Sequence, residues 1–576
     1  MSVSVIIIAK LLKDASIFEG EFKMITNEQL ADLIFPDVKE TIEDLEKRYP
    51  KRNLGEKAEV TRFAPSPTGF LHTGSLFTSM ICQKLAKQSG GVFYIRLEDT
   101  DTKREISGAG EQLLNEMKKF DVVPNEGYLG DHEEGEYGPY TQSKRAHIYK
   151  VCIKELLRQG KAYPCFCSSS DIEELRKAQE ANKMIPGYYG PFAKCKMLTN
   201  EERYELIKSG KPFVIRFNSN GNHNRKIRVF DLIHGTFAIA ENDQDIVIYK
   251  SDGLPTYHFA HACDDHFMHT TTVIRGEEWI SSLPIHLQLF EALGFETPSY
   301  AHVPVIMKID ENGNRRKLSK RKDKEAAVSY FLDDGYPSEA LIMYLMTIAN
   351  SNFEEYIFQE DFKNMDKFEL SFEKFSLDGA LFDEIKLQFF AREILARKTK
   401  EEMLQLTLAY AKDHDERLYS YVNSNKEYFM EIINIERENE NPRKDYYKLG
   451  GLLDTIGFFY NDIYDSSLDV SIFNPNIASD IKISLLEELR DTLDFDKPQD
   501  QWFNDMKEIG QKHKFAPSNK IYKADKENYV GHVGDVAELL RISLCAKKNA
   551  PNLYYVMRVL GKAEVTRRID KVISLL

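Results

Sequence analysis

The sequence predicts an α/β fold built on a parallel sheet, followed by an all-α C-terminal region. Residues 60–64 and 92–98 have the pattern of strands, and an amphipathic helical pattern over residues 75–88 separates them. Strand, helix and strand in this order imply a parallel sheet, whose ligands lie at the carboxyl ends of the strands. Strand-like segments return at residues 245–249 and 272–275, so we expect the α/β part to continue there.

The rest of the chain departs from this alternation in two places. Residues 160–245 carry clustered cysteines and polar loops, which indicates an insertion. Beyond residue 325 the strand signals fade and amphipathic helical patterns dominate. The apolar residues of one late helical pattern are Val533, Val536, Ala537, Leu540 and Leu544.

Length and composition exclude several classes of protein. The chain has 576 residues, so at roughly 150 residues per domain we expect several domains. A formal net charge of −14 argues against a generic polyanion binder, although it leaves room for a local basic path. Seven cysteines in so long a chain favour reduced thiols over a disulfide framework. No secretory signal or membrane-spanning run is visible, and we expect a cytoplasmic protein.

The segment Arg62–Gly74, RFAPSPTGFLHTG, has the pattern of a nucleotide-binding turn that leads from a strand into a helix. The first turn of a helix offers free backbone amides and the positive end of the helix dipole, which suit phosphates. Gly74 allows close approach of the backbone, and His72 can donate to a phosphate oxygen. Taken alone, the tripeptide HTG before a helix is as well explained by chance.

The segment Lys317–Arg321, KLSKR, is a second candidate for phosphate binding. Catalysis of phosphoryl or nucleotidyl transfer is mostly positioning and cancellation of charge, for which lysines on a loop are suited. The alternative is a solvated basic loop, because further arginines and lysines surround the segment.

Together the two segments resemble the HIGH and KMSKS signatures of class I aminoacyl-tRNA synthetases, here HTGS and KLSKR. The prefix RFAPSPTG narrows the resemblance to bacterial-type glutamyl-tRNA synthetases, and GPYTQSKR at residues 138–145 is similar to another segment of that family. The resemblance implies a Rossmann-like catalytic domain with an inserted α+β domain, and an all-α anticodon-binding region.

The resemblance also implies roles for individual residues. His72, Lys317 and Lys320 are the expected catalytic residues. The expected ATP-binding residues are Thr68, His72, Gly74, Glu278, Trp279, Lys317, Lys320 and Arg321. The expected glutamate-binding residues are Arg62, Ala64, Ser66, Glu98, Tyr257, His261 and Arg275.

The charges of these side chains are complementary to those of glutamate, which presents one ammonium and two carboxylates. Glu98 is expected at the α-amino group, Arg275 at the α-carboxylate, and Arg62 with Tyr257 at the side-chain carboxylate. Many family members have an asparagine where this chain has His261, so the role of this histidine stays open. Trp279 fits an ordinary core position equally well.

The cysteines Cys165, Cys167 and Cys195 resemble a zinc knuckle in the insertion of some bacterial glutamyl-tRNA synthetases. Three thiolates and one further donor complete a tetrahedral zinc site, and Tyr189 is the candidate for the fourth ligand. Three ordinary reduced cysteines are the alternative. A zinc ion here would be structural.

The expected domains follow from the resemblance. They are an N-terminal helical extension (1–57), the first half of the catalytic domain (58–159), an inserted acceptor-stem-binding domain (160–245), the second half of the catalytic domain (246–300), a stem-contact domain with KLSKR (301–385) and a helical anticodon-binding domain (386–576). The extension departs from the family's usual start, and Met24 is a candidate initiation site.

The expected activity is ATP-dependent ligation of L-glutamate to tRNA through a glutamyl-adenylate. ATP with Mg²⁺, tRNA(Glu) and a monomeric enzyme are implied, and tRNA(Gln) stays open as a second acceptor. A glutaminyl-tRNA synthetase is the nearest alternative, although its anticodon-binding part is usually β-barrel. A small-molecule nucleotidyltransferase would need neither KLSKR nor the helical region, and a non-catalytic RNA-binding protein would be expected to lack His72, Lys320 or Glu98.

Overall fold

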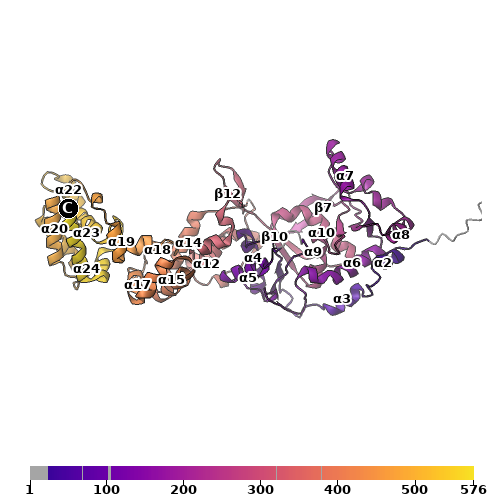
Figure 1. The fold of residues 1–576 in the computed structure, drawn as a ribbon, viewed down its shortest axis with the longest axis horizontal. Helices are drawn as coiled ribbons and strands as arrows, with labels where there is room; N and C mark the ends of the chain where they lie inside the picture. The colour runs from indigo at the N-terminus through magenta and orange to yellow at the C-terminus, as the bar shows by residue number, and fades with distance from the viewer. Residues whose placement is uncertain (1–23, 68, 102–105, 320, 378) are drawn as a thin grey trace, which may run out of the picture. The chain divides into compact units, whose positions relative to one another are not determined.

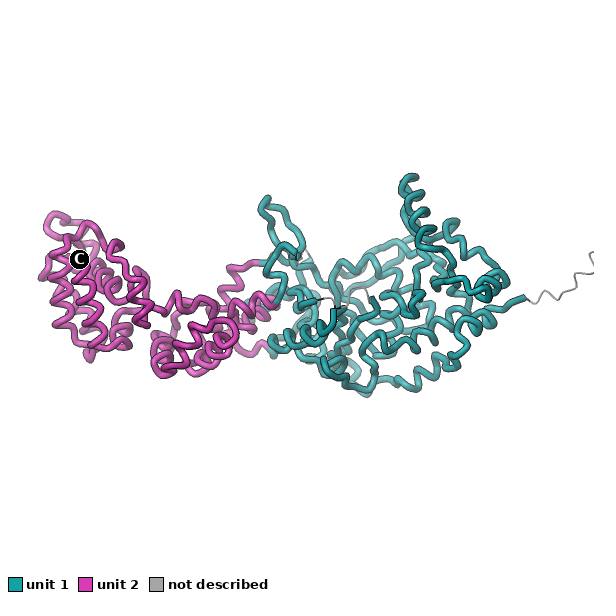
Figure 2. The backbone as a smooth tube through the Cα atoms, in the orientation of Figure 1, with its two compact units in different colours: residues 1–328, 347–356, 366–382 teal, residues 329–346, 357–365, 383–576 magenta. Residues whose placement is uncertain are grey.

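The computed structural model describes residues 24–67, 69–101, 106–319, 321–377 and 379–576. It divides into two compact units, which Figure 2 colours separately. Unit 1 contains the residues up to 328 together with 347–356 and 366–382; unit 2 contains 329–346, 357–365 and 383–576. Thr68 and Lys320, both predicted to bind ATP, lie outside the described residues.

A parallel sheet forms the centre of unit 1, as the sequence predicts. Its first strands are β1 (Val60–Phe63), β2 (Val92–Ile95) and β3 (Glu126–Tyr128), with β4 (Glu133–Glu134) antiparallel at the edge. A second parallel pair consists of β10 (Thr272–Gly276) and β11 (Ser299–Val303). The backbone N–H of Thr271 donates to the carbonyl of Val60, which brings β10 beside β1. All four residues of β1 are buried, as expected for a parallel strand covered on both faces.

Helices pack around this sheet (Figure 1). They are α4 (Thr73–Ser89), α5 (Ala109–Lys119), α6 (Ala146–Arg158), α9 (Tyr257–Phe267) and α10 (Leu283–Leu293). The predicted face of α4 is buried at Leu76, Phe77, Met80 and Ile81. The helix ends at Gly90, whose φ of 69° is a conformation that glycine adopts without steric cost.

The inserted part contains a separate antiparallel sheet of β5 (Ala162–Cys165), β6 (Val214–Phe217) and β9 (Val247–Tyr249), the hairpin β7 (Lys226–Asp231) and β8 (Gly235–Ala240), and the helices α7 (Ser169–Ala181) and α8 (Asn200–Lys208). The strand predicted at residues 245–249 therefore belongs to this sheet and not to the parallel one. Its period-2 pattern fits either sheet, and only the long-range pairing with β6 decides between them.

The segment before β1 shares the core of unit 1. Its helices α2 (Asn27–Ile34) and α3 (Ile42–Arg48) both begin with a threonine capping box and pack on α6. Ala31, Phe35, Val38, Leu45 and Tyr49 lie in the same hydrophobic cluster as the buried faces of α6, α9 and α10. Residues 24–57 are therefore an integral layer of this unit.

The KLSKR segment follows a small sheet in unit 1. β12 (Ile306–Ile309) pairs antiparallel with β13 (Arg315–Lys317) and parallel with β14 (Ala380–Leu381). Between the β12–β13 hairpin and β14 the chain forms α11 (Val328–Asp333), α12 (Ser338–Ala349) and α13 (Phe353–Gln359), whose residues are divided between the two units.

From residue 383 onward the described chain is helical, with one two-stranded pair, β15 (Phe515–Ala516) and β16 (Gly531–His532), which confirms the predicted all-α region. Its helices are α14 (Glu384–Arg397), α15 (Lys400–His414), α16 (Glu416–Ser424), α17 (Lys426–Ile433), α18 (Leu452–Ile456), α19 (Asn461–Ser467), α20 (Ser479–Thr492), α21 (Gln499–Lys512), α22 (Asn519–Ala524), α23 (Val533–Cys545) and α24 (Leu553–Leu575). The predicted apolar pattern at 533–544 forms α23. Among the described residues, no helix has the length and apolar character to cross a bilayer.

Candidate active site

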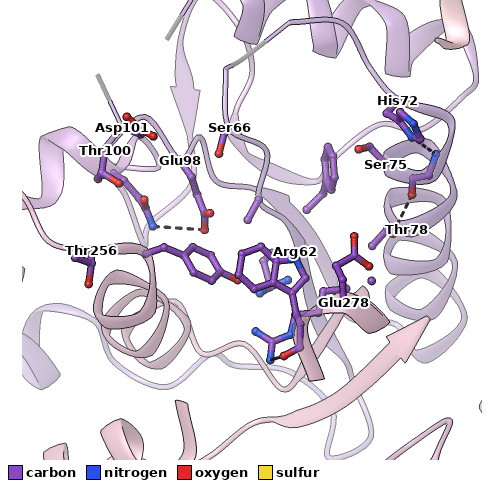
Figure 3. Close-up of a pocket in the computed structure, with 18 of the residues that line it drawn as sticks. Arg62, Ser66, His72, Ser75, Thr78, Glu98, Thr100, Asp101, Thr256 and Glu278 are labelled. Atoms are coloured by element: carbon purple, nitrogen blue, oxygen red, sulfur yellow. Dashed lines mark hydrogen bonds between the residues drawn. The ribbon is translucent and has the colours of Figure 1, made fainter. Parts of the chain in front are cut away.

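A cavity of about 1410 Å³ opens at the carboxyl ends of the parallel strands in unit 1. Most of the predicted site residues line it, although they come from segments more than two hundred residues apart: Arg62, Ala64, Ser66, His72, Gly74, Glu98, Tyr257, Arg275, Glu278, Trp279 and Lys317. Figure 3 shows Glu98 and His72 on opposite sides of this cavity. His261 and Arg321 do not line it.

The first turn of α4 forms one wall of the cavity. His72 is its N-cap, and its Nδ1 accepts the backbone N–H of Gly74 at 2.9 Å. A neutral imidazole that accepts at Nδ1 carries its proton on Nε2, which makes Nε2 a donor. The wall therefore combines backbone amides, the positive end of the helix dipole and an imidazole donor, a combination that suits anionic oxygens.

Glu98, beyond the end of β2, supplies a carboxyl group on the other side. Its Oε1 accepts from Arg96 Nη2 at 3.1 Å and from Gln142 Nε2 at 3.5 Å. Burial raises the pKa of Glu98 to about 7, against the opposing effect of Arg96 and Arg62. The carboxyl is consequently poised between its neutral and charged forms near neutral pH.

Buried ion pairs lie beneath the cavity floor. Arg62 Nε is 3.1 Å from Asp265 Oδ1, and Arg96 Nη1 is 2.8 Å from the same oxygen. Arg145 Nε contacts Asp264 Oδ1 at 2.6 Å. Burial disfavours the charge on Asp265, but Arg62 and Arg96 more than offset it and hold its pKa well below the ordinary value. The two aspartates therefore fix the floor and neutralise much of its positive charge.

Asp264 and Asp265 were not among the predicted site residues. Both lie in α9 in the sequence YHFAHACDDHF, and both are buried. Two adjacent acids in a helix whose other residues are aromatic, alanine, cysteine or histidine were the signal for a buried charge network, because carboxylates are almost never fully buried without a partner.

Tyr257 and Trp279 form an aromatic part of the lining, with ring centroids 4.6 Å apart. His261 lies one turn of α9 beyond Tyr257 and is fully buried. Its Nε2 is 3.0 Å from the hydroxyl of Tyr300, and its Nδ1 is 2.5 Å from Asp265 Oδ2. Burial is the main cause that lowers the pKa of His261 to about 3. The structure thus places this histidine below the cavity, in the charge network.

The KLSKR segment approaches the cavity through Lys317, whose Nζ is 2.6 Å from Glu278 Oε1. The backbone N–H of Ser319 donates to Asp323 Oδ2 at 2.9 Å, and Arg316 pairs with the same carboxylate. Hydrogen bonds from Arg316, together with the backbone N–H of Ser319, hold the pKa of Asp323 well below its ordinary value despite burial, so this carboxylate stays charged while it holds the loop. Arg321 is exposed.

The three predicted metal ligands are brought together in the inserted part. The sulfur atoms of Cys165, Cys167 and Cys195 lie within 4.8 Å of one another. The hydroxyl of Tyr188 lies 3.5 Å from Cys165 Sγ and 3.4 Å from Cys167 Sγ. The hydroxyl of Tyr189, the predicted fourth donor, instead donates to the carbonyl of Ile185 at 2.8 Å. The side chain beside the thiols is therefore that of Tyr188.

Residues 59–388 match the family model for the catalytic domain of class I tRNA synthetases (E and Q). The chain belongs to this family. Residues 523–573 of this synthetase also match an anticodon binding domain, within the helical region of unit 2. The family and the fold class that the sequence predicts are thus confirmed.

Curated relatives place the synthetase among the glutamate--tRNA ligases. It is 44% identical over 551 residues to the glutamate--tRNA ligase of Clostridium perfringens (strain SM101 / Type A), a match that covers 95% of this chain and 100% of the relative. The glutamate--tRNA ligase of Acetivibrio thermocellus is 40% identical over 546 residues, with 95% of this chain and 99% of the relative covered. The matches cover 95% of this chain, which is more than residues 58–576 could supply by themselves. The relatives therefore match at least part of the segment before residue 58 as well.

A solved structure with the same fold is the glutamate tRNA ligase from Elizabethkingia meningosepticum in complex with its amino acid. It has a TM-score of 0.70 and 27% sequence identity, and the match covers 90% of this chain and 100% of that chain. The glutamate-tRNA synthetase from Elizabethkingia anophelis gives a TM-score of 0.71 with the same coverage. This synthetase is therefore an aminoacyl-tRNA ligase in fold as well as in sequence.

Proposed function

We propose that this synthetase activates L-glutamate with ATP and transfers it to the 3′ end of tRNA(Glu). In the first step a carboxylate oxygen of glutamate attacks the α-phosphorus, and pyrophosphate leaves. In the second step the terminal ribose hydroxyl attacks the carbonyl carbon of glutamyl-adenylate, and AMP leaves. The observation that carries the proposal is one cavity that combines an acid, basic side chains and a helix N-terminus.

The amino acid occupies the part of the cavity around Glu98 and Arg275. Glu98 contacts the α-amino group, and Arg275 contacts the α-carboxylate. Arg62 with Tyr257 contacts the side-chain carboxylate, with Ala64 and Ser66 beside it. Support comes from the complementarity of charge, since an ammonium needs an anion and each carboxylate needs a cation or strong donors.

ATP occupies the part of the cavity around the N-terminus of α4. His72 and the backbone at Gly74 bind phosphate oxygens, and Glu278 and Trp279 flank the adenosine. Lys317, together with Lys320 and Arg321, neutralises the phosphates, and Thr68 is a further ATP-binding residue. Mg²⁺ bound with ATP would offset the negative charge of the triphosphate. No enzyme nucleophile is needed, because a carboxylate oxygen of glutamate itself attacks the α-phosphorus.

We also propose a structural zinc ion held by Cys165, Cys167 and Cys195, with the hydroxyl of Tyr188 as fourth donor. Three clustered thiols and one oxygen match the coordination number that Zn²⁺ prefers. The neighbouring Cys195 thiol is the largest cause that lowers the pKa of Cys165 to about 4, while the pKa of Cys195 rises, so the first thiolate of the pair forms readily. The ion would tie the end of β5 to the loop around Cys195.

The division into the six domains given above, a monomeric state, a cytoplasmic location and tRNA(Gln) as a second acceptor remain proposals. Glutamate specificity is supported by the names of the curated relatives. The choice between the two tRNAs depends on contacts of the helical region with the anticodon.

ATP–pyrophosphate exchange tests the activity directly. We expect exchange that requires glutamate and is stimulated by tRNA(Glu), with glutamine inactive at equal concentration. Exchange that glutamine drives in the absence of glutamate would overturn the assigned amino acid.

A further inference from the structure

Arg275 differs from the other basic side chains that line the cavity. Arg62 pairs with Asp265 at 3.1 Å, Lys250 with Asp252 at 2.8 Å, and Lys317 with Glu278 at 2.6 Å. Among the described residues, no carboxylate lies within ion-pair distance of Arg275, although its exposed fraction is only 6%. A buried guanidinium without a counter-ion is costly, so its surroundings must be built to hold it.

Two imidazoles hold the guanidinium. Arg275 Nε donates to His302 Nε2 at 3.0 Å, and Arg275 Nη1 donates to His286 Nδ1 at 3.1 Å. The ring of Tyr300 lies under the guanidinium, 5.0 Å from its central carbon. Arginine has donors only, so both ring nitrogens must accept, and the ring protons lie on His302 Nδ1 and His286 Nε2.

Further contacts fix these two tautomers. Asp231 Oδ2 accepts from His302 Nδ1 at 2.7 Å and from the backbone N–H of His302 at 3.1 Å. Its Oδ1 accepts from the backbone N–H groups of Ile233 and His234, both at 2.9 Å. His286 Nε2 lies 2.9 Å from His258 Nδ1, in position to donate. Each histidine therefore has its proton on the side away from Arg275.

The fold brings this chain of contacts together from four elements. Arg275 on β10 and His302 on β11 are register partners in adjacent parallel strands. Asp231 is the last residue of β7, and His286 lies on α10. Asp231, His302 and His286 are all fully buried. Each member of this chain of contacts therefore belongs to a strand or a helix and not to a loop.

Both imidazoles stay uncharged at neutral pH. Burial is the largest cause that lowers the pKa of His302, and Arg275 adds to it against the opposing effect of Asp231. Burial likewise places the pKa of His286 well below the ordinary value, with His261 and Arg275 contributing. The contacts of Arg275 therefore orient its guanidinium and leave its positive charge uncompensated.

We propose that His302, held by Asp231, and His286 are positioning residues that aim the uncompensated charge of Arg275 at a carboxylate of the amino acid substrate. A carboxylate in place of either imidazole would compete with that substrate group, whereas a neutral acceptor does not. The inference rests on the proposed function, because it takes the ligand of Arg275 to be the amino acid.

Two substitutions at His302 separate positioning from packing. His302→Phe keeps a ring of similar size but removes the acceptor, so we expect the KM for glutamate in ATP–pyrophosphate exchange to rise at least tenfold while the KM for ATP stays within twofold. His302→Gln places an amide oxygen near the position of Nε2, so it should restore the KM for glutamate to within about threefold of the wild type. Thermal unfolding of both variants checks the fold.

Asp231→Asn is a second, nearly isosteric test. The asparagine oxygen can still accept from the backbone of Ile233 and His234, but the amide NH₂ group that faces His302 Nδ1 can only donate. It therefore favours the tautomer of His302 with its proton on Nε2, which cannot accept from Arg275. We expect a several-fold rise in the KM for glutamate here too, with the KM for ATP unchanged.

The possible results have distinct meanings. A wild-type enzyme without glutamate-dependent exchange would refute the proposed function itself. Normal wild-type exchange with an unchanged KM for glutamate in His302→Phe or Asp231→Asn would overturn only the positioning role. That role is overturned as well if glutamate and ATP lose affinity together, or if Gln at 302 is as damaging as Phe.

Discussion

Single ionisable groups set the chemical character of the cavity. Three arginines share two buried aspartates and Glu98, so most of the positive charge beneath the cavity is neutralised within the protein. Glu98 is the acid of this set whose pKa burial raises to about 7. Its charge can therefore change within the pH range in which the enzyme is assayed.

Glu98 should make glutamate binding sensitive to pH. Its carboxylate form, which the ammonium of the substrate needs, is lost as the pH falls through about 7. Between pH 8 and pH 6 we therefore expect the KM for glutamate to rise up to about tenfold, because one pKa unit corresponds to a tenfold ratio of the two forms. Exchange kinetics at fixed ionic strength measure this, with the KM for ATP as reference. Glu98→Gln should have a high KM that varies little with pH; a flat wild-type profile would contradict the assignment.

Cys195 should be required for bound zinc. Metal analysis of purified protein should give about one zinc per chain, since three thiols and one oxygen complete a structural site. Cys195→Ser should reduce zinc well below that and lower the melting temperature. Cys545→Ala, a buried cysteine in unit 2, is the matched control and should retain zinc. Equal metal content in all three proteins would show that the thiols are not ligands.

At the scale of single residues, the sequence predicted the side chains that line the cavity, but not the buried side chains that orient them. Motif residues such as His72 and Arg275 do line the cavity. Asp231 and His302 were missed, because their contact joins residues 71 positions apart and leaves no local pattern. Tyr189 was chosen over Tyr188 because a sequence gives no direction for neighbouring side chains in a loop.

At the N-terminus of α4, His72 has two roles. The imidazole caps the helix through Nδ1 and presents a donor through Nε2. The strand–turn–helix pattern around it was predictable, because strand burial and helical periodicity are local signals.

Substitutions at His72 should separate these two tasks. His72→Ala removes both, so we expect adenylate formation to slow by roughly 10²–10³-fold, as for other single donors to a developing charge, and the melting temperature to fall. His72→Asn keeps a capping side chain and should retain the melting temperature while the rate stays low. Single-turnover formation of adenylate and thermal unfolding measure the two effects. Wild-type rates in His72→Ala would remove this residue from the mechanism.

Lys154 of α6 ties α2 and the turn that follows it to the rest of unit 1. Its Nζ donates to the carbonyls of Phe35 and Val38 at 3.1 and 2.7 Å and pairs with Asp32 at 2.6 Å. The sequence predicted the helix α2 but not its packing, since nothing local links residue 154 to residues 35–38.

Lys154→Met should therefore destabilise unit 1. Loss of charged hydrogen bonds to buried carbonyls should cost about 2–3 kcal/mol, seen as a lower midpoint in denaturant-induced unfolding. Lys177→Met on the exposed face of α7 is the control and should change little. If both variants unfold alike, the contacts of Lys154 contribute nothing measurable.

The whole molecule carries an excess of negative charge although its proposed partner is an RNA. With 77 basic and 91 acidic residues, general attraction cannot supply tRNA affinity. Binding must come from local contacts of lysines and arginines with phosphates. The order of the catalytic and helical regions could be predicted from motifs, whereas the division into two compact units, with residues 347–356 and 366–382 in unit 1, could not.

Added salt should therefore weaken the binding of tRNA but not the binding of the amino acid. Raising NaCl from about 50 to 200 mM should increase the KM for tRNA(Glu) by roughly tenfold or more, because each phosphate contact releases counterions. The KM for glutamate should change by less than twofold, since its partners are buried. Aminoacylation kinetics at several salt concentrations give both values; equal effects on the two would contradict local phosphate recognition.

The proposed function depends on one cavity that holds glutamate and ATP together. A crystal structure with a non-hydrolysable glutamyl-adenylate analogue tests this most directly. We predict that the ammonium of the analogue contacts Glu98, that its side-chain carboxylate lies at Arg62 and Tyr257, and that its phosphate mimic points to the N-terminus of α4. An analogue whose amino-acid part lies outside the cavity lined by Glu98 and Arg275 would contradict the proposed function.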